Sequence, residues 1–238
     1  MNLDILAFAA HPDDVEISAA GTLMKYAALD KKIGIVDLTE GELGTRGNVQ
    51  TRYDEAENAG NLIGLNTRVN LRMKDGFFEN NEENKRLIIQ QIRKYRPEIV
   101  FCNSISDRHP DHGRAAKLVE EACFLSGLRK IETEFDGVKQ DEFRPRLVLH
   151  YIQDYYIEPD FVVDVTPFAE KKIEVIKAYK TQFFDPNSNE PETPISGEEF
   201  FDFIKGRMIT MGRPAGMKYA EGFTISRFFG VKDIFDLI

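Results

Sequence analysis

The sequence predicts an α/β fold of three layers, in which helices cover both faces of a mainly parallel, Rossmann-like sheet. Short apolar runs alternate with longer segments of helical periodicity along most of the 238 residues, and this order is typical of βαβ units. The first run, Leu3 to Ala9, is apolar at consecutive positions, as expected for a strand that helices cover on both faces. No linker divides the chain, so we expect a single domain over residues 1–238.

The first half of the chain is expected to contain four strands, each followed by a helix. The strands are predicted at 3–9, 33–38, 68–71 and 99–101, and the helices at about 15–29, 50–63, 81–95 and 115–125. A strand, a helix and a second strand within roughly thirty residues form a βαβ unit, which is nearly always right-handed.

The second half is less regular. Residues 129–144 are charged and show no clear periodicity, so we expect an exposed excursion there. Further strands are predicted at 147–151 and 161–165, helices at 166–179 and 197–208, and a loop at 185–194. The tail from Thr210 ends in an apolar segment, 228–238, which suits either the core or an interface between copies of the chain. The sequence is therefore compatible with a homo-oligomer.

Composition excludes several classes of protein. The formal net charge is −9 and basic residues are not clustered, which argues against a nucleic-acid partner. No apolar run approaches the length of a membrane span, and the first residues lack the basic region of a signal peptide. The two cysteines, Cys102 and Cys123, do not form a disulfide framework. These features predict a cytoplasmic protein with no membrane partner.

Two His-Pro-Asp turns stand at equivalent places in the predicted fold. The turn from His11 to Asp14 follows the first strand and opens a helix, and the turn from His109 to His112 does the same after the fourth strand. Ligands of open α/β sheets bind outside the carboxyl ends of the strands. The two turns therefore meet if their strands are neighbours, although the sequence does not fix the strand order.

The residues of these turns suit one metal ion. Imidazole and carboxylate are zinc ligands, and a catalytic zinc typically takes three protein ligands and leaves a position for water. His11 and Asp14 are three residues apart on a tight turn, so one ion can take both. His112 completes the set, since it starts the second helix as Asp14 starts the first. Fe²⁺ is an alternative to Zn²⁺ as the bound metal, because two histidines and a carboxylate also bind non-haem iron.

The other polar residues of the turns have two explanations. Asp13 and His109 are free to act as acid–base groups, and Asp111 can orient an imidazole. Alternatively, Asp13 or Asp14 is a helix N-cap, and His109 or His112 is a surface residue of a polar turn. The second explanation must account for two matching turns that use three of only four histidines. We therefore favour the metal site.

A glycine-rich loop and two further polar residues lie at the same edge of the predicted sheet. Three glycines between Thr39 and Asn48 exclude a regular element there. Arg52 lies in the first turn of the next helix, where a basic residue opposes the helix dipole, so it suits a ligand as well as solvent. Asp75 lies in the turn that ends the third strand.

The two turns resemble the paired motif of the LmbE-like (PIG-L) zinc-dependent N-deacetylases. Residues 37–47, with Arg52 and Glu55 after them, are similar to the glycine loop and following helix of that family. Residues 218–223 are typical of its bacillithiol-biosynthesis branch, which removes acetate from N-acetylglucosaminyl malate. The resemblance covers nearly the whole chain. It implies a small-molecule N-acetylglucosamine conjugate as substrate, with chito-oligosaccharides and related compounds as the alternative.

The resemblance also implies a role for each matching residue. His11, Asp14 and His112 match the zinc ligands. Asp13 matches the general base, and His109 matches the imidazole that stabilises the oxyanion, with Asp111 behind it. Arg52 and Asp75 match positions that contact substrate in relatives.

The aglycone and the alternative class of protein depend on other residues. A malate aglycone carries two carboxylates, which Arg46, Arg52 and Arg108 are candidates to bind in a bidentate manner. Some members of that family place a tyrosine near the oxyanion as a phenolic donor. The comparable region of this chain, around residues 199–201, contains no tyrosine. A non-catalytic sugar-binding protein with a structural metal is disfavoured, because structural zinc sites normally have four protein ligands and are often rich in cysteine.

Overall fold

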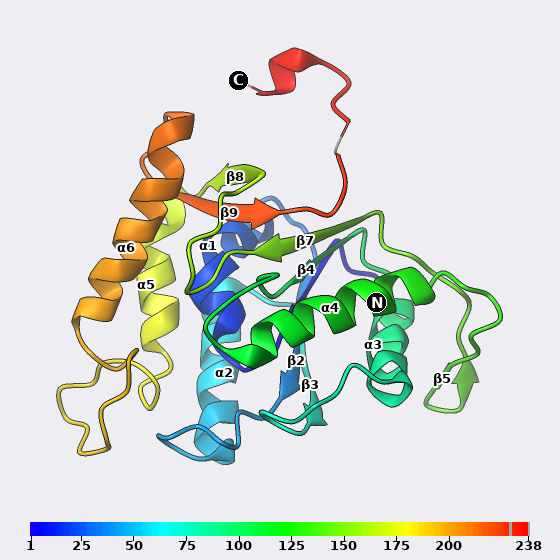
Figure 1. Ribbon diagram of the computed structural model, residues 1–238, viewed down its shortest axis with the longest axis horizontal. Helices are drawn as coiled ribbons and strands as arrows, with labels where there is room; N and C mark the ends of the chain where they lie inside the picture. The colour runs from blue at the N-terminus through cyan, green and yellow to red at the C-terminus, as the bar shows by residue number, and fades with distance from the viewer. Residues whose placement is uncertain (229, 238) are drawn as a thin grey trace.

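A seven-stranded sheet lies at the centre of the molecule (Figure 1). The computed structural model describes residues 1–228 and 230–237. The strand order is β3-β2-β1-β4-β7-β9-β8. These strands are β1 (Ile5–Ala9), β2 (Ile33–Thr39), β3 (Thr67–Met73), β4 (Ile99–Cys102), β7 (Leu147–Tyr151), β8 (Phe161–Asp164) and β9 (Ala220–Thr224). The first five in this order are parallel, whereas β9 is antiparallel to both of its neighbours, so the predicted mainly parallel sheet is confirmed.

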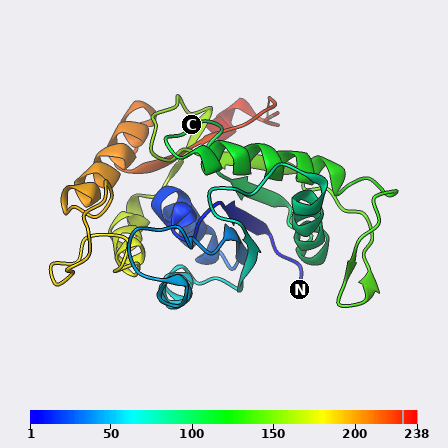
Figure 2. The same ribbon diagram turned by 60° about the horizontal axis from the view of Figure 1, so that its bottom comes forward.

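Helices pack on both faces of this sheet (Figures 1 and 2). One layer contains α1 (Asp14–Ala27), α2 (Val49–Ile63), α5 (Ala169–Lys177) and α6 (Glu199–Gly212), and the other contains α3 (Glu82–Tyr95) and α4 (Pro110–Leu125). Alternate side chains of β1 enter opposite cores: Ala7 packs in the cluster with α1 and α5, and Phe8 packs in the cluster with α3 and α4. This alternation explains the continuous apolar run of the first strand and confirms the three layers.

The predicted elements are present with shifted ends, and two features were not predicted. The helix predicted from residue 115 begins at Pro110, because His109 caps it and proline suits the first helical position. A short hairpin, β5 (Glu134–Phe135) and β6 (Val138–Lys139), lies within the charged excursion. The other is β9, since the sequence predicts no strand beyond residue 165. Its sequence, Ala-Glu-Gly-Phe-Thr, has a charge and a glycine where strands usually have apolar residues.

A buried ion pair explains the charge in β9. Glu221 Oε1 lies 2.6 Å from Lys172 Nζ of α5, and both side chains are almost fully buried. The Glu221 carboxylate also accepts the backbone N–H groups of Gly21 and Thr22 in α1, at 2.9 and 2.7 Å. A Cβ on Gly21 would lie 2.9 Å from Glu221 Oε1, so this close approach requires glycine. Glu221 therefore ties β9 to two helices.

The chain beyond β9 leaves the body of the molecule (Figure 1). Phe228 is fully exposed, and Ile234 and Phe235 are mostly exposed, so these residues do not join the core. Residues 229 and 238 of the predicted apolar segment lie outside the described residues. Within the described ranges, no helix has the length and apolar character that crossing a membrane would require.

Candidate functional site

The strand order brings the two His-Pro-Asp turns together. β1 and β4 are parallel neighbours at the centre of the sheet. The next strand of this sheet along the chain lies on the outer side of each, β2 beside β1 and β7 beside β4. This is the position at which open α/β sheets bind ligands. The ring centroid of His11 lies 4.7 Å from that of His109 and 5.6 Å from that of His112. The predicted convergence of the turns is therefore present.

Asp14 lies between the two histidines that the sequence pairs with it. Its Oδ2 is 3.6 Å from His11 Nδ1, and its Oδ1 is 3.1 Å from His112 Nε2. The side chain amides of Asn103 and Gln153 also donate to this carboxylate, at 2.9 and 3.1 Å. The backbone N–H of His11 donates to Oδ2 as well, at 2.9 Å, so three hydrogen bonds fix the orientation of Asp14.

The other ring nitrogen of each histidine faces a carboxylate. His11 Nε2 lies 3.0 Å from Asp75 Oδ1 and 3.4 Å from Asp111 Oδ2, and His112 Nδ1 lies 2.5 Å from Asp107 Oδ2. A carboxylate that accepts the proton of one ring nitrogen leaves the lone pair of the other nitrogen free for a metal. The free nitrogens, His11 Nδ1 and His112 Nε2, both face the Asp14 carboxylate between them. These donors fit a metal ion.

His109 has the opposite arrangement. It is the N-cap of α4, and its Nδ1 accepts the backbone N–H of Asp111 at 3.3 Å. The proton of the neutral ring is therefore assigned to Nε2, which then has no lone pair for a metal. Burial, together with His11 and His112, lowers the pKa of His109. His109 thus offers an N–H donor, although its ring nitrogens lie close enough to those of His11 and His112 to share one ion.

The predicted pairing of Asp111 with His109 differs from the contacts in the structure. The Asp111 carboxylate lies against His11 Nε2 and Arg114 Nη1, and it accepts the Gly76 N–H at 2.8 Å. Among the described residues, the hydrogen bond between Asp111 and His109 is made by the backbone N–H of Asp111 and not by its carboxylate. The Asp111 carboxylate therefore faces the imidazole of His11, whereas the prediction placed it behind His109.

Asp13 carries a second buried carboxylate. It occupies the N-cap position of α1 with φ at 120°, and its side chain makes no capping hydrogen bond. Its Oδ2 instead accepts from Arg52 Nη1 at 2.7 Å, and the same nitrogen donates to the Pro12 carbonyl at 3.1 Å. Burial raises the pKa of Asp13 to about 6, although Arg52 opposes this. Capping therefore does not explain the Asp13 side chain, and its strained backbone is typical of functional sites.

The charges of the cluster favour a cation. Burial lowers the pKa of His112, but Asp14 and the hydrogen bond with Asp107 outweigh it and raise the value to about 9. Burial likewise opposes the ionised form of Asp14, yet the charge of His112 and the hydrogen bond with His11 hold the pKa of Asp14 well below its usual range. The carboxylates thus stabilise positive charge at this place.

These groups line a cavity of about 320 Å³. Gly41, Gly44 and Thr45 of the glycine-rich loop form one wall. Residues 193–195 and three side chains of α6 form another, and these α6 residues are Phe200, Phe203 and Arg207. The sequence did not assign α6, Asp107 or Gln153 to the site. Gln153 follows the carboxyl end of β7, so the rule that locates ligands at strand ends could have found it.

Arg46 does not line this cavity, in contrast to its assignment as a substrate-binding residue. Its Nη1 donates to the Phe183 carbonyl at 3.4 Å, Nη2 donates to Ser188 Oγ, and Nε lies 3.5 Å from Glu190 Oε2. Gln182 Nε2 donates to the Arg46 carbonyl at 2.9 Å. Arg46 therefore anchors the segment that leads to residues 193–195, and its guanidinium is already engaged.

The other predicted substrate residues line the cavity but already have partners. Both oxygens of Asp75 are hydrogen-bonded, one to His11 Nε2 and the other to the Leu43 N–H, each at 3.0 Å. Arg108 is about half exposed, and its Nε lies 2.6 Å from Asp154 Oδ2. Arg52 pairs with Asp13, as described above. Asp75 thus holds His11 in place, whereas Arg108 lies at the open side of the cavity.

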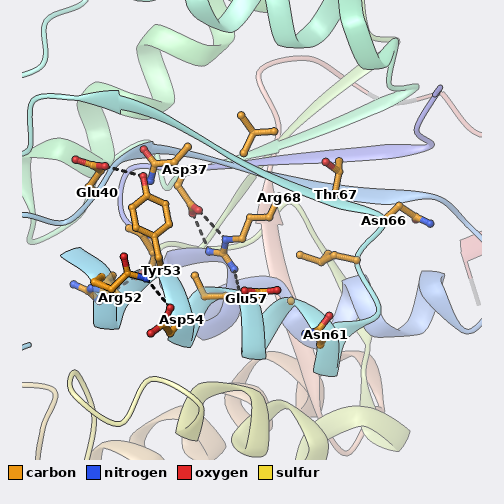
Figure 3. A pocket seen from close by; sticks show the side chains of 17 residues that line it. Asp37, Glu40, Arg52, Tyr53, Asp54, Glu57, Asn61, Asn66, Thr67 and Arg68 are labelled. Carbon is orange, nitrogen blue, oxygen red and sulfur yellow. Dashed lines mark hydrogen bonds and ion pairs between the residues drawn. The ribbon is translucent and has the colours of Figure 1, made fainter. Parts of the chain in front are cut away.

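A second cavity, of about 450 Å³, lies between α2 and β3 (Figure 3). Two contacts join side chains of its lining: Arg68 Nε lies 2.7 Å from Asp37 Oδ2, and Tyr53 donates to Glu40 at 2.7 Å. Arg52 borders both cavities, but none of the clustered histidines lines this one. The candidate site is therefore the smaller cavity.

Three curated relatives are similar to this chain. The diacetylchitobiose deacetylase of Thermococcus kodakarensis is 26% identical over 228 residues, which are 92% of this chain and 81% of the relative. The uncharacterized deacetylase YaiS of Escherichia coli is 31% identical over 166 residues, 60% of this chain and 86% of the relative. The probable N-acetyl-alpha-D-glucosaminyl L-malate deacetylase 2 of Bacillus anthracis is 26% identical over 196 residues, 75% of this chain and 81% of the relative.

A solved structure and a family model agree with these relatives. The crystal structure of the conserved protein TT1542 from Thermus thermophilus superposes with a TM-score of 0.85 at 32% identity, covering 97% of this chain and 98% of that one. The model of the PIG-L family, described as GlcNAc-PI de-N-acetylase, matches residues 6–123, which include both His-Pro-Asp turns. The chain therefore belongs to the PIG-L family of LmbE-like N-deacetylases.

Proposed function

We propose that this protein is a metal-dependent N-deacetylase that hydrolyses the acetamide of an N-acetylglucosamine conjugate. One observation carries the proposal: the free nitrogens of His11 and His112 face the Asp14 carboxylate, in a cavity that Asp13 and His109 also line. Membership of the PIG-L family supports the reaction type. Deacetylases among the relatives support it as well.

His11, Asp14 and His112 would hold the metal, with zinc as the first candidate and iron(II) as the second. A divalent ion bound there would lower the pKa of a water molecule and polarise the amide carbonyl. Asp75, Asp107 and Asp111 keep the two imidazoles in the required orientation.

Asp13 and His109 would carry the proton transfer and the charge stabilisation. The water oxygen attacks the carbonyl carbon, and Asp13, held by Arg52, takes the proton. His109 Nε2–H donates a hydrogen bond to the carbonyl oxygen as that oxygen becomes negative. Asp13 then returns its proton to the nitrogen as the carbon–nitrogen bond breaks, which gives acetate and a free amine.

Two substrates from this class are supported. N-acetylglucosaminyl malate is the primary proposal, because residues 218–223 resemble the bacillithiol branch and a relative carries that activity in its name. A chito-oligosaccharide is the second candidate, because the diacetylchitobiose deacetylase matches more of the chain at equal identity.

Removal and return of metal should test the proposed reaction. Amine release from N-acetylglucosaminyl malate and from diacetylchitobiose is measured for the protein as isolated, after chelation, and after addition of zinc or iron(II). We expect chelation to abolish turnover and one of the two metals to restore it. Full turnover by the chelated, metal-free protein would exclude the mechanism. Bound metal with no turnover on any N-acetylglucosamine compound would favour a binding protein.

Replacing His109 should separate a catalytic imidazole from a ligand. His109→Ala is expected to reduce kcat by about 10²- to 10³-fold, because an oxyanion donor is lost, with the metal content unchanged. His109→Asn keeps a side chain that can cap α4, so an equal loss in both variants excludes the lost cap as the cause. Loss of metal from both variants would instead indicate the set of His11, His109 and His112.

A further inference from the structure

Two arginines meet at one end of the cavity. Arg108 Nε lies 2.6 Å from Asp154 Oδ2, and Arg207 Nη2 donates to the Asp154 carbonyl at 2.9 Å. Asp154 follows Gln153, whose amide donates to Asp14 Oδ1. The arginines therefore lie beside the proposed metal ligands, and all five residues line the same cavity.

Arg207 has a donor that the described residues do not use. Its guanidinium carbon lies 4.5 Å from the ring centroid of Phe203, so the ring restricts its orientation. Its Nη1 is buried and has no hydrogen-bond partner in the described chain. Burial lowers the pKa of Arg207, with Asp154 and Asp107 opposing, but an arginine stays charged in proteins. A buried charged donor without a partner is costly, which points to an acceptor outside the chain.

The other arginines near the site have protein partners. Arg52 donates to Asp13 and to the Pro12 carbonyl. Arg46 anchors the segment before residue 193, outside the cavity. Arg108 pairs with Asp154 but remains about half exposed, so its remaining nitrogens are open to a ligand. Guanidinium groups bind carboxylates with a geometry that ammonium groups cannot reproduce.

We propose that Arg207 is a specificity-determining residue that binds a carboxylate on the uncleaved part of the substrate, with Arg108 beside it. This inference rests on the proposed deacetylase function and narrows its substrate class. Conjugates with an anionic aglycone are then preferred to neutral chito-oligosaccharides. The guanidinium lies within a wall of Phe200 and Phe203, where low polarity strengthens a charge-assisted hydrogen bond.

A structural role is the competing explanation. Arg207 also borders a small internal cavity of about 10 Å³ with Ser18, whose Oγ likewise has no partner in the described chain. A single water molecule in that cavity would satisfy Nη1 without any ligand. Such a role affects stability but not the choice between substrates.

A specificity ratio tests the proposal. We would measure kcat/KM on N-acetylglucosaminyl malate and on neutral methyl N-acetylglucosaminide for the wild type, Arg207→Met and Arg207→Lys. The ratio of the two values is expected to fall about tenfold or more in Arg207→Met, with partial recovery in Arg207→Lys. Lys205→Met removes a partly exposed positive charge from the same helix and should keep the wild-type ratio. A ratio in Arg207→Met equal to that of Lys205→Met would overturn the proposal.

Binding of free L-malate gives a readout that does not need turnover. Calorimetric titration should show that L-malate binds to the wild type, and that its Kd is about tenfold or more higher for Arg207→Met. Arg207→Gln replaces that variant if methionine prevents folding. Absence of malate binding to an active wild-type enzyme overturns the carboxylate subsite alone. Arg207-dependent malate binding by a protein that deacetylates nothing keeps the subsite and rejects the proposed function.

Discussion

Asp13→Asn is expected to reduce kcat by about 10²- to 10⁴-fold, the usual contribution of a positioned acid–base group. The physical reason is specific to the carboxylate, because asparagine keeps the shape and can still accept the hydrogen bond from Arg52. It cannot take a proton from water or return one to the departing amine. Asp13 is not among the proposed ligands, so the metal content and the Tm should stay close to those of the wild type.

Steady-state kinetics and metal analysis on the same preparation would check this result. Asp202→Asn, which changes an exposed carboxylate of α6 outside the cavity, is the matched control and should keep wild-type turnover. A normal kcat in Asp13→Asn would mean that another group is the base. Loss of metal from this variant would make Asp13 a ligand and require a new assignment for Asp14.

The second large effect is expected on stability, at the ion pair that joins α5 to β9. Lys172→Met leaves the buried carboxylate of Glu221 without its cation, and Glu221→Gln leaves a buried ammonium without its anion. Removing one member of such a pair costs about 3–5 kcal/mol. For a chain of this size the Tm should fall by roughly 6–20 °C. Glu221→Gln also weakens two hydrogen bonds to α1, so its effect should be the larger.

Thermal unfolding of four variants would test the pair. The double variant Lys172→Met/Glu221→Gln should lose less stability than the sum of the single changes, because neither charge is then left unpaired. Lys139→Met breaks an exposed pair with Glu132, which solvent screens, so its Tm should stay close to that of the wild type. Single variants as stable as Lys139→Met would show that the buried pair contributes little.

The sequence alone determined the parallel half of the fold. Continuous apolar runs such as Leu3 to Ala9 can be buried on both faces only between two layers of helices, so the three layers follow from local pattern. The same pattern placed both His-Pro-Asp turns at the carboxyl ends of strands. It failed at β9, because the signal of that strand is a buried charge whose partner, Lys172, is far away in the sequence.

Only the tertiary structure decided how the site residues divide their tasks. The adjacency of β1 and β4 depends on strand order, which local patterns do not carry. Whether a histidine can bind a metal depends on what its second nitrogen contacts: Asp107 for His112, and a backbone N–H for His109. These partners lie two to five residues away, yet the helix cap and the loop conformation decide which nitrogen each one meets.

The arginines show the same division between sequence and structure. Composition and position made Arg46 a candidate for substrate binding. In the structure, residues between 183 and 190, which are far from Arg46 in the sequence, contact its guanidinium outside the cavity. Arg207 had no sequence signal, because its α6 lies about a hundred residues after the second turn and reaches the site only through packing. The sequence therefore determined the chemistry available at the sheet edge. Long-range packing decided which of those groups remain free to act, since a side chain's availability depends on the partners that the fold brings to it.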